Sequence, residues 1–316
     1  MTEAMTSFHQ TGSPLGIRLS NWGRWGDDDE LGTLNFVTPA KRVQAAQLVK
    51  TGKIFDLGMP FDANGPERGG FRFNPIHLMR VTPVESWASR GASDGLLVAD
   101  DVIIMPLQCA TQWDGLAHVG YGGFLYNNTP AEAVTAFDGA KRLSFANVCD
   151  RLISRGVLLD IARLKGLDRL EDATEITAED LSEAEARQGV RVESGDFLLV
   201  RTGFYQHLLE GDKERFMGNF PGLGLSTLEW LHEREVAAVA VDNEGVEVRP
   251  SRIEGSLIPF HMVAIRDMGL MLGEEFDLEK LAEDCAADGV YEFLLCAPGL
   301  KITNSVGSPI TPMAIK

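Results

Sequence analysis

Two side chains that can move protons or bind a metal stand close together at Asp114 and His118. They lie in the segment QCATQWDGLAH, residues 108–118, which His118 ends and which the glycine-rich stretch GYGG follows closely. A carboxylate and an imidazole four residues apart share one face of a helical turn, and an irregular loop can also bring them together. Spacing alone is a weak signal, because His118 bonded to a backbone carbonyl and Asp114 capping loop amides explain the same residues.

The elements around this segment are predicted from apolar runs and turn clusters. Thr38 followed by Pro39 opens a helix that closes near Gly52. From residue 53 to 106, short apolar runs alternate with turn clusters and favour strands linked by loops. The last of these strands, residues 101–107, reads as buried and leads into the 108–118 segment.

Strands and helices continue to mix downstream. A helix begins at Ala178 behind the cap of Thr177 and Asp180, and Ser226 with Glu229 forms a second capping box. A last helix, capped by Asp277, stops near residue 289. Four further strands are predicted, over residues 156–160, 197–201, 236–241 and 291–297.

The chain shows no internal repeat and no long linker, so we expect one compact α/β domain over residues 1–316. Residues 1–37 form an irregular amino-terminal segment within it. That segment carries Trp22 and Trp25, two large aromatics that need a pocket or a partner.

Composition excludes several classes of function. A formal charge of −17 repels phosphate backbones and anionic lipid surfaces, so nucleic acid and membrane are not expected partners. The four cysteines lie far apart without a CxxC pair, which fits free thiols in a reducing compartment. Neither a signal pattern nor a stretch of about 18 apolar residues is present, and a cytoplasmic protein is expected.

The 108–118 segment resembles the cyclase superfamily, whose signature is HxGTHxDxPxH. Asp114 and His118 fall on its aspartate and final histidine, and Thr111 also matches. The similarity extends from NWGRWGDDDELGTLN through VAAVAVDNEGVEV to VGSPITPMAIK, nearly the whole chain. The chain is similar to the longer members of this superfamily, which includes bacterial kynurenine formamidase and isatin hydrolase. The resemblance implies a mixed central sheet or barrel-like core flanked by helices.

The resemblance also implies a divalent metal. In the family the two leading histidines and the aspartate bind it, joined in dinuclear members by a distant histidine and glutamate, which His261 and Glu274 resemble. This chain departs from the pattern, because Gln108 and Gln112 occupy the leading histidine positions. A neutral amide oxygen suits Mn²⁺, Mg²⁺ or Ca²⁺ better than Zn²⁺, so Mn²⁺ is preferred.

The resemblance implies one possible ligand set, Gln112, Asp114, His261 and Glu274. Gln108 would then support these ligands without touching the metal. His118 is expected to act as general acid and base beside Asp114. Asp242 and Glu247, at the end of a predicted strand, either orient ligands and loops or cap backbone amides.

Four residues are substrate-binding candidates through the resemblance: Trp22, Trp25, His77 and Trp113. Plain core packing explains the aromatic members equally well.

The function expected is metal-assisted hydrolysis of an amide or lactone in a small, perhaps cyclic or aromatic, substrate. Two alternatives stay open because of Gln108 and Gln112: metal-free acid–base cyclisation or dehydration, and a non-catalytic member that binds a small ligand. Relatives form dimers or tetramers, so the resemblance implies a homodimer or homotetramer.

Overall fold

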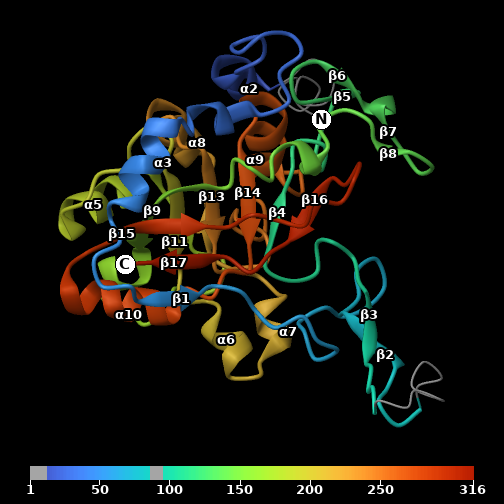
Figure 1. The fold of residues 1–316 in the computed structure, drawn as a ribbon. Coiled ribbons are helices and arrows are strands. Elements are labelled where there is room, and N and C mark those ends of the chain that lie inside the picture. Colours follow the sequence, from blue (N-terminus) through green and yellow to red (C-terminus); the bar gives the residue numbers. More distant parts are fainter. Residues whose placement is uncertain (1–12, 86–94) are drawn as a thin grey trace.

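A curled, nine-stranded mixed sheet forms the centre of the molecule, and helices flank it (Figure 1). The computed structural model describes residues 13–85 and 95–316. In spatial order the strands are β1 (Ile54–Asp56), β17 (Met313–Ile315), β15 (Glu292–Cys296), β9 (Ile153–Asp160), β11 (Phe197–Arg201), β13 (Ala238–Val241), β14 (Met271–Glu274), β4 (Gln112–Asp114) and β16 (Gly307–Pro309). The mixed α/β fold expected from the sequence is confirmed.

The four middle strands, β9, β11, β13 and β14, run parallel, and the outer strands add antiparallel on both sides. Strands β11, β13 and β14 are buried along their whole length, because helices cover the faces of the sheet. Uninterrupted apolar runs are the pattern that such doubly covered parallel strands require. The strands predicted over 197–201 and 236–241 are therefore confirmed.

The helices are short, and several lie along the rim of the sheet (Figure 1). They are α2 (Pro14–Leu19), η1 (Gly32–Phe36), α3 (Pro39–Ala46), η2 (Ala131–Ala133), η3 (Phe145–Asn147), α4 (Ile161–Leu164), α5 (Ala178–Gln188), α6 (Gln206–Leu209), α7 (Lys213–Phe216), α8 (Ser226–Glu233), α9 (Pro259–His261), the π-helix η4 (Met262–Met268) and α10 (Glu279–Asp288). Small two-stranded sheets are formed by β5 (Phe124–Leu125) with β6 (Thr129–Pro130), β7 (Val134–Thr135) with β8 (Gly139–Ala140), and β10 (Glu175–Ile176) with β12 (Gly222–Leu223).

Two predicted capping boxes have different outcomes. Thr177 accepts from the amide of Asp180, whose carboxylate accepts from the amide of Thr177, so the box of α5 is confirmed. The box predicted at Ser226 is wrong, because Ser226 is the first residue of α8 and its hydroxyl accepts from the amide of Ala178 instead.

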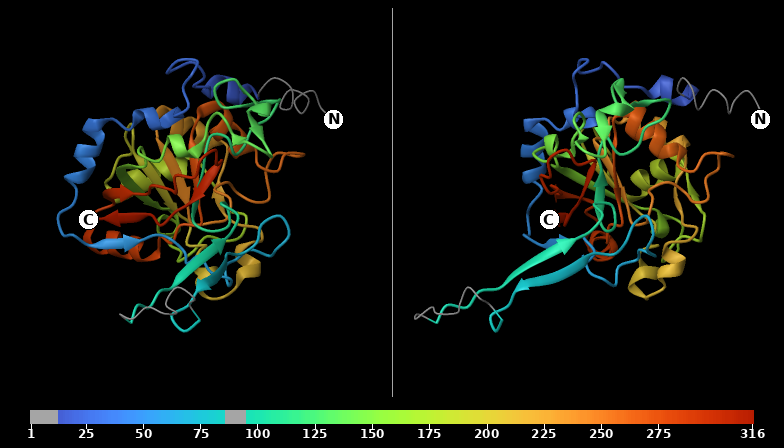
Figure 2. Two further views of the ribbon diagram at one scale, coloured as in Figure 1. Left: turned by 45° about the vertical axis from the view of Figure 1, so that its right-hand side comes forward. Right: turned by 90° about the vertical axis from the view of Figure 1, so that its right-hand side faces the viewer.

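The predicted buried strand over 101–107 is also wrong. Strand β3 (Asp100–Ile104) pairs only with β2 (Ile76–Val81), and the two form a hairpin that projects from the body of the molecule (Figure 2). Every residue of β3 is exposed, because no other described element covers this hairpin. We call it the arm.

The expected irregular segment 1–37 contains two short helices among its described residues, and residues 1–12 lie outside the described part. Ser13 accepts from the amide of Gly16 and Pro14 starts α2, so this helix has an ordinary cap. Within the described residues no helix is both long and apolar enough to cross a lipid bilayer. All four cysteines are free thiols, as expected.

Candidate active site

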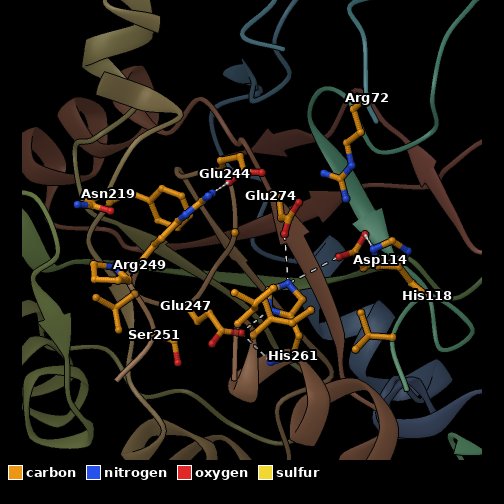
Figure 3. A pocket seen from close by; sticks show the side chains of 17 residues that line it. Arg72, Asp114, His118, Asn219, Glu244, Glu247, Arg249, Ser251, His261 and Glu274 are labelled. Carbon is orange, nitrogen blue, oxygen red and sulfur yellow. Dashed lines mark hydrogen bonds and ion pairs between the residues drawn. The ribbon is translucent and has the colours of Figure 1, made fainter. Parts of the chain in front are cut away.

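A cavity of about 380 Å³ opens beside the edge of the sheet where β14 and β4 pair (Figure 3). Its walls come from segments far apart in the sequence. The polar residues that line it are Arg72, Asp114, His118, Asn219, Glu244, Glu247, Arg249, Ser251, His261 and Glu274.

Strand register explains why two carboxylates meet in this cavity. Glu274 of β14 stands opposite Gln112 of β4, and Asp114 is two residues further along the same strand. Because side chains alternate across a strand, Gln112 and Asp114 share one face with Glu274. All three are buried. The spatial convergence of residues 112–118 with Glu274, expected from the resemblance, is present in the structure.

His261 joins this cluster from α9, and Glu247 fixes its position. The Glu247 carboxylate accepts from the amides of Phe260 and His261, at 3.2 and 2.9 Å, and contacts the Nδ1 of His261 at 2.7 Å. The Nε2 atom therefore points the other way, towards Glu274 Oε1 at 3.2 Å and Asp114 Oδ2 at 3.8 Å. Holding one ring nitrogen with a carboxylate is how proteins orient a metal-binding histidine.

Asp114, His261 and Glu274 form a compact set of possible metal ligands. One ligand atom from each lies within 4.8 Å of the others, and all three residues are buried. Burial raises the pKa of Glu274, and the neighbouring Asp114 carboxylate adds to this rise. Burial lowers the pKa of His261, but its hydrogen bonds to Glu247 and Glu274 outweigh burial and bring the pKa to about 10. Two carboxylates this close are stabilised by a shared proton or by a cation between them.

Gln112 lies at the same point with an amide that is only half satisfied. Its Nε2 donates to Glu274 Oε2 at 2.5 Å and lies 3.4 Å from Asp114 Oδ1. Its Oε1 is buried without a hydrogen-bond partner. A half-turn of the amide would present this oxygen to the space between the carboxylates as a hard, neutral donor. The donor set therefore fits a divalent cation.

His118 stands at the edge of the cluster and faces the cavity (Figure 3). Its Nε2 lies 3.6 Å from Asp114 Oδ1, and 21% of its side chain is exposed. A tight turn brings the two together, because the His118 amide donates to the carbonyl of Gly115. The other residues of the cluster are buried, so solvent or a ligand reaches the His118 imidazole most readily.

Trp113 is not a cavity residue. It points to the opposite face of β4, is fully buried, and packs edge-on against Phe197 and Phe276. Its Nε1 donates to the carbonyl of Ala297 at 3.0 Å. The alternation that brings Gln112 and Asp114 to the cavity turns Trp113 into the core.

The other three substrate-binding candidates also lie outside the cavity lining. Trp22 donates from Nε1 to the carbonyl of Arg266, and Trp25 packs against Phe36. His77 is on the exposed arm, where it pairs with Asp101 at 2.8 Å. Core packing, the alternative left open for the tryptophans, describes Trp22, which packs against the core, whereas Trp25 is half-buried against the half-buried Phe36.

Asp242, Glu247 and Gln108 have distinct positions. The buried Asp242 carboxylate accepts from the amides of Thr202 and Gly203, so of its two expected roles it takes the capping one. Glu247 orients His261, as described above. Gln108 is outside the cavity lining, and its Nε2 is buried without a partner.

Three charged residues of the cavity escaped sequence reasoning: Arg72, Glu244 and Arg249. Glu244 and Arg249 pair with each other at 3.2 Å. Neither periodicity nor a motif marks Arg72, which lies in an irregular loop before the arm. Only the carboxylate-rich stretch 242–247 carried a signal, and it pointed to residues 242 and 247.

The curled sheet and the buried carboxylate–imidazole cluster define an α/β protein with a pocket suited to a divalent cation. A family model named Cyclase matches residues 55–248. A solved structure described as a novel cyclase is 42% identical, has a TM-score of 0.87, and covers 94% of this chain and 100% of its own. The chain belongs to the Cyclase family.

More distant structures share the fold. Isatin hydrolase A from Ralstonia solanacearum is 17% identical with a TM-score of 0.63, over 88% of this chain and 98% of that one. A structure described as a predicted metal-dependent hydrolase from Bacillus stearothermophilus is 16% identical with a TM-score of 0.53, over 84% of this chain and 98% of that one. No curated protein matches the chain.

Proposed function

We propose that this protein is a metal-dependent hydrolase that cleaves the C–N or C–O acyl bond of a small amide or lactone. The observation that carries the proposal is the cluster of Asp114, His261 and Glu274 on the wall of a cavity of about 380 Å³ that His118 also lines. A cavity of this size takes a small molecule. The fold shared with isatin hydrolase A and with a structure described as a predicted metal-dependent hydrolase supports the same class of reaction.

Asp114, His261 and Glu274 would hold the cation, with Gln112 as a further oxygen donor. Two carboxylates, one imidazole and one amide oxygen favour a hard cation, and we propose Mn²⁺ over Zn²⁺. Such a cation polarises a carbonyl and lowers the pKa of a bound water from about 15.7 towards neutrality. Glu247 keeps the Nδ1 side of His261 occupied, so its Nε2 faces the ligand cluster.

His118 is the proposed general acid and base. Its imidazole borders the cavity, and its Nε2 lies 3.6 Å from Asp114 Oδ1. From this position it would take a proton from the attacking water and return it to the leaving nitrogen or oxygen. An imidazole suits both steps, because its ring nitrogens can accept and donate a proton.

One observation favours the metal-free alternative. With its amide as it stands, Gln112 donates into Glu274, and the elevated pKa of His261 keeps a positive charge beside the two carboxylates. Protons, instead of a metal ion, then balance the negative charge of the cluster. Asp114, His118 and Glu274 would in that case support acid–base cyclisation or dehydration.

A substrate screen distinguishes the two. Small amides and lactones are offered to chelator-treated protein before and after addition of Mn²⁺, with His118→Ala as the catalytic variant and His77→Ala, on the arm, as the control. We expect Mn²⁺-dependent turnover that falls by about 10²- to 10⁴-fold in His118→Ala and stays unchanged in His77→Ala. Turnover that is equal with and without Mn²⁺ supports the metal-free reaction, and full activity of His118→Ala removes this residue from the mechanism.

A further inference from the structure

Arg72 enters the cavity from a loop that the structure holds in place. Asn74 accepts from the amide of Glu67 and donates to its carbonyl, at 2.9 and 3.0 Å, which ties the two ends of the loop together. Arg68, in the same loop, donates to the carbonyl of Glu214 on α7 at 2.7 Å. The guanidinium of Arg72 is carried on this tethered loop and points to the side of the cavity where Asp114 and Glu274 lie (Figure 3).

Arg72 has no bonded partner among the described residues. No hydrogen-bond acceptor is recorded for its guanidinium there, and no carboxylate lies within ion-pair distance of it. The other cavity arginine, Arg249, is paired with Glu244. Burial lowers the pKa of Arg72, but the field of Glu274, Asp114 and Glu244 raises it above its ordinary value. The side chain therefore stays a cation whose donors are free.

An unpaired guanidinium that is partly withdrawn from water lacks the acceptors that it would otherwise have. Glu274 and Asp114 are the carboxylates that act most strongly on the Arg72 guanidinium, but in the proposed enzyme their oxygens bind the cation. A planar fork of donors matches a carboxylate better than any neutral group. The cavity lining also contains the apolar side chains of Val119, Phe220, Leu257 and Ile258.

We propose that Arg72 binds a carboxylate that the substrate already carries, so that the enzyme acts on small acidic amides or lactones with an apolar body. This inference rests on the proposed function for the reaction, but binding alone can test it. Arg72 is a specificity residue in this scheme, and His118 and the ligand cluster do the chemistry.

The test measures ligand binding by calorimetry in a His118→Ala background, where we expect turnover to be about 10²- to 10⁴-fold slower. The probes are N-formylphenylalanine and N-formylphenethylamine, which differ by the carboxylate. Arg72→Gln should weaken binding of the acid about tenfold or more and leave the neutral probe unchanged. Arg68→Gln, in the same loop but paired with Glu214 outside the cavity, is the matched control and should bind both probes as the parent does. Arg72→Lys should fall between, because it keeps the charge and loses the fork.

Several results would overturn the proposal. Equal losses for both probes would make Arg72 a shape-determining residue, and a parent protein with no preference for the acid would remove the subsite. A loss confined to phenylacetate, added as a product-like acid, would assign Arg72 to the carboxylate made by hydrolysis. A change in Mn²⁺ affinity without any change in acid preference would make it a counter-ion of Asp114 and Glu274. None of these results depends on turnover, so a failed substrate screen leaves the test intact.

Discussion

At the scale of single residues, Glu247 shows how one side chain determines what another can do. Its carboxylate accepts from two amides at the start of α9 and contacts the Nδ1 of His261. The same carboxylate thus fixes the backbone of α9 and the orientation of the imidazole. The Nε2 of His261 therefore points towards Glu274 and Asp114. Outer groups of this kind support the ligands that touch a metal.

Glu247→Gln tests this arrangement. The variant keeps the shape but has a single acceptor oxygen for the donors that Glu247 now serves, so His261 is held less firmly. We expect Mn²⁺ affinity to fall by about 10- to 100-fold, measured by the paramagnetic resonance of free Mn²⁺ during titration. Glu254→Gln, an exposed glutamate on the following loop, serves as the control. An unchanged affinity in Glu247→Gln would mean that His261 does not depend on this carboxylate.

The residues of the cluster and those that surround it differ in how far the sequence predicts them. Asp114, His118, His261 and Glu274 were predicted through the resemblance to the cyclase superfamily, and the structure brings all four together. Arg72 was missed because its position depends on a loop closed by Asn74 and on the packing of distant segments. Pocket walls of that kind have no local signature.

At the scale of elements, the register between β4 and β14 explains most of the site. A shift of β4 by one residue would turn Asp114 into the core and Trp113 into the cavity. Gly273 helps to fix the register, because a Cβ there would lie 2.6 Å from the Trp113 ring. Antiparallel pairing of strands 162 residues apart is invisible to local patterns, which is why Trp113 was taken as a substrate contact.

The arm shows a second limit of local patterns. An apolar run was read as buried, but Ile76 and Leu78 on β2 face outward with Val102 and Ile104 on β3. This makes one apolar face, which the described residues do not cover. An isolated two-stranded sheet is at best marginally stable in water, so such a face calls for a partner surface.

We propose that the arm packs against the arm of a second copy, consistent with the homodimer or homotetramer expected from relatives. The face is identical in each copy, and its paired residues Ile76, Ile104, Leu78 and Val102 are uncharged, so a twofold axis can bring two of them together. Leu78→Asp should lower the molar mass measured by light scattering to that of a smaller species. Met79→Asp, on the opposite face of the same strand, is the control and should leave the mass unchanged. A wild-type protein that is monomeric at micromolar concentration contradicts the proposal.

At the scale of the whole molecule, the sequence predicted the fold class and three of the four middle strands, β9, β11 and β13. It predicted neither β14 nor the order of the strands in the sheet. Continuous apolar runs such as residues 197–201 report burial directly, so β11 matches the prediction. The order of the nine strands depends on pairings between distant segments, such as β1 with β17. Local periodicity holds no information on such pairings.

The acidic character of the chain also extends into its cavity. Asp114, Glu244, Glu247 and Glu274 line it against Arg72 and Arg249 and two histidines, within a protein of formal charge −17. A divalent cation there would meet a favourable field, whereas an anionic substrate needs a local cation to enter. Arg72 is the group that meets that need in our account.

Mn²⁺ binding to wild-type protein and to Glu274→Gln tests the central claim most directly. Glu274→Gln keeps the side-chain shape but removes one of the two charges that the cluster offers a cation. We predict stoichiometric Mn²⁺ on the wild-type chain, measured by elemental analysis after reconstitution and dialysis, and its loss in Glu274→Gln. A wild-type chain that retains no more Mn²⁺ than the variant would contradict the account.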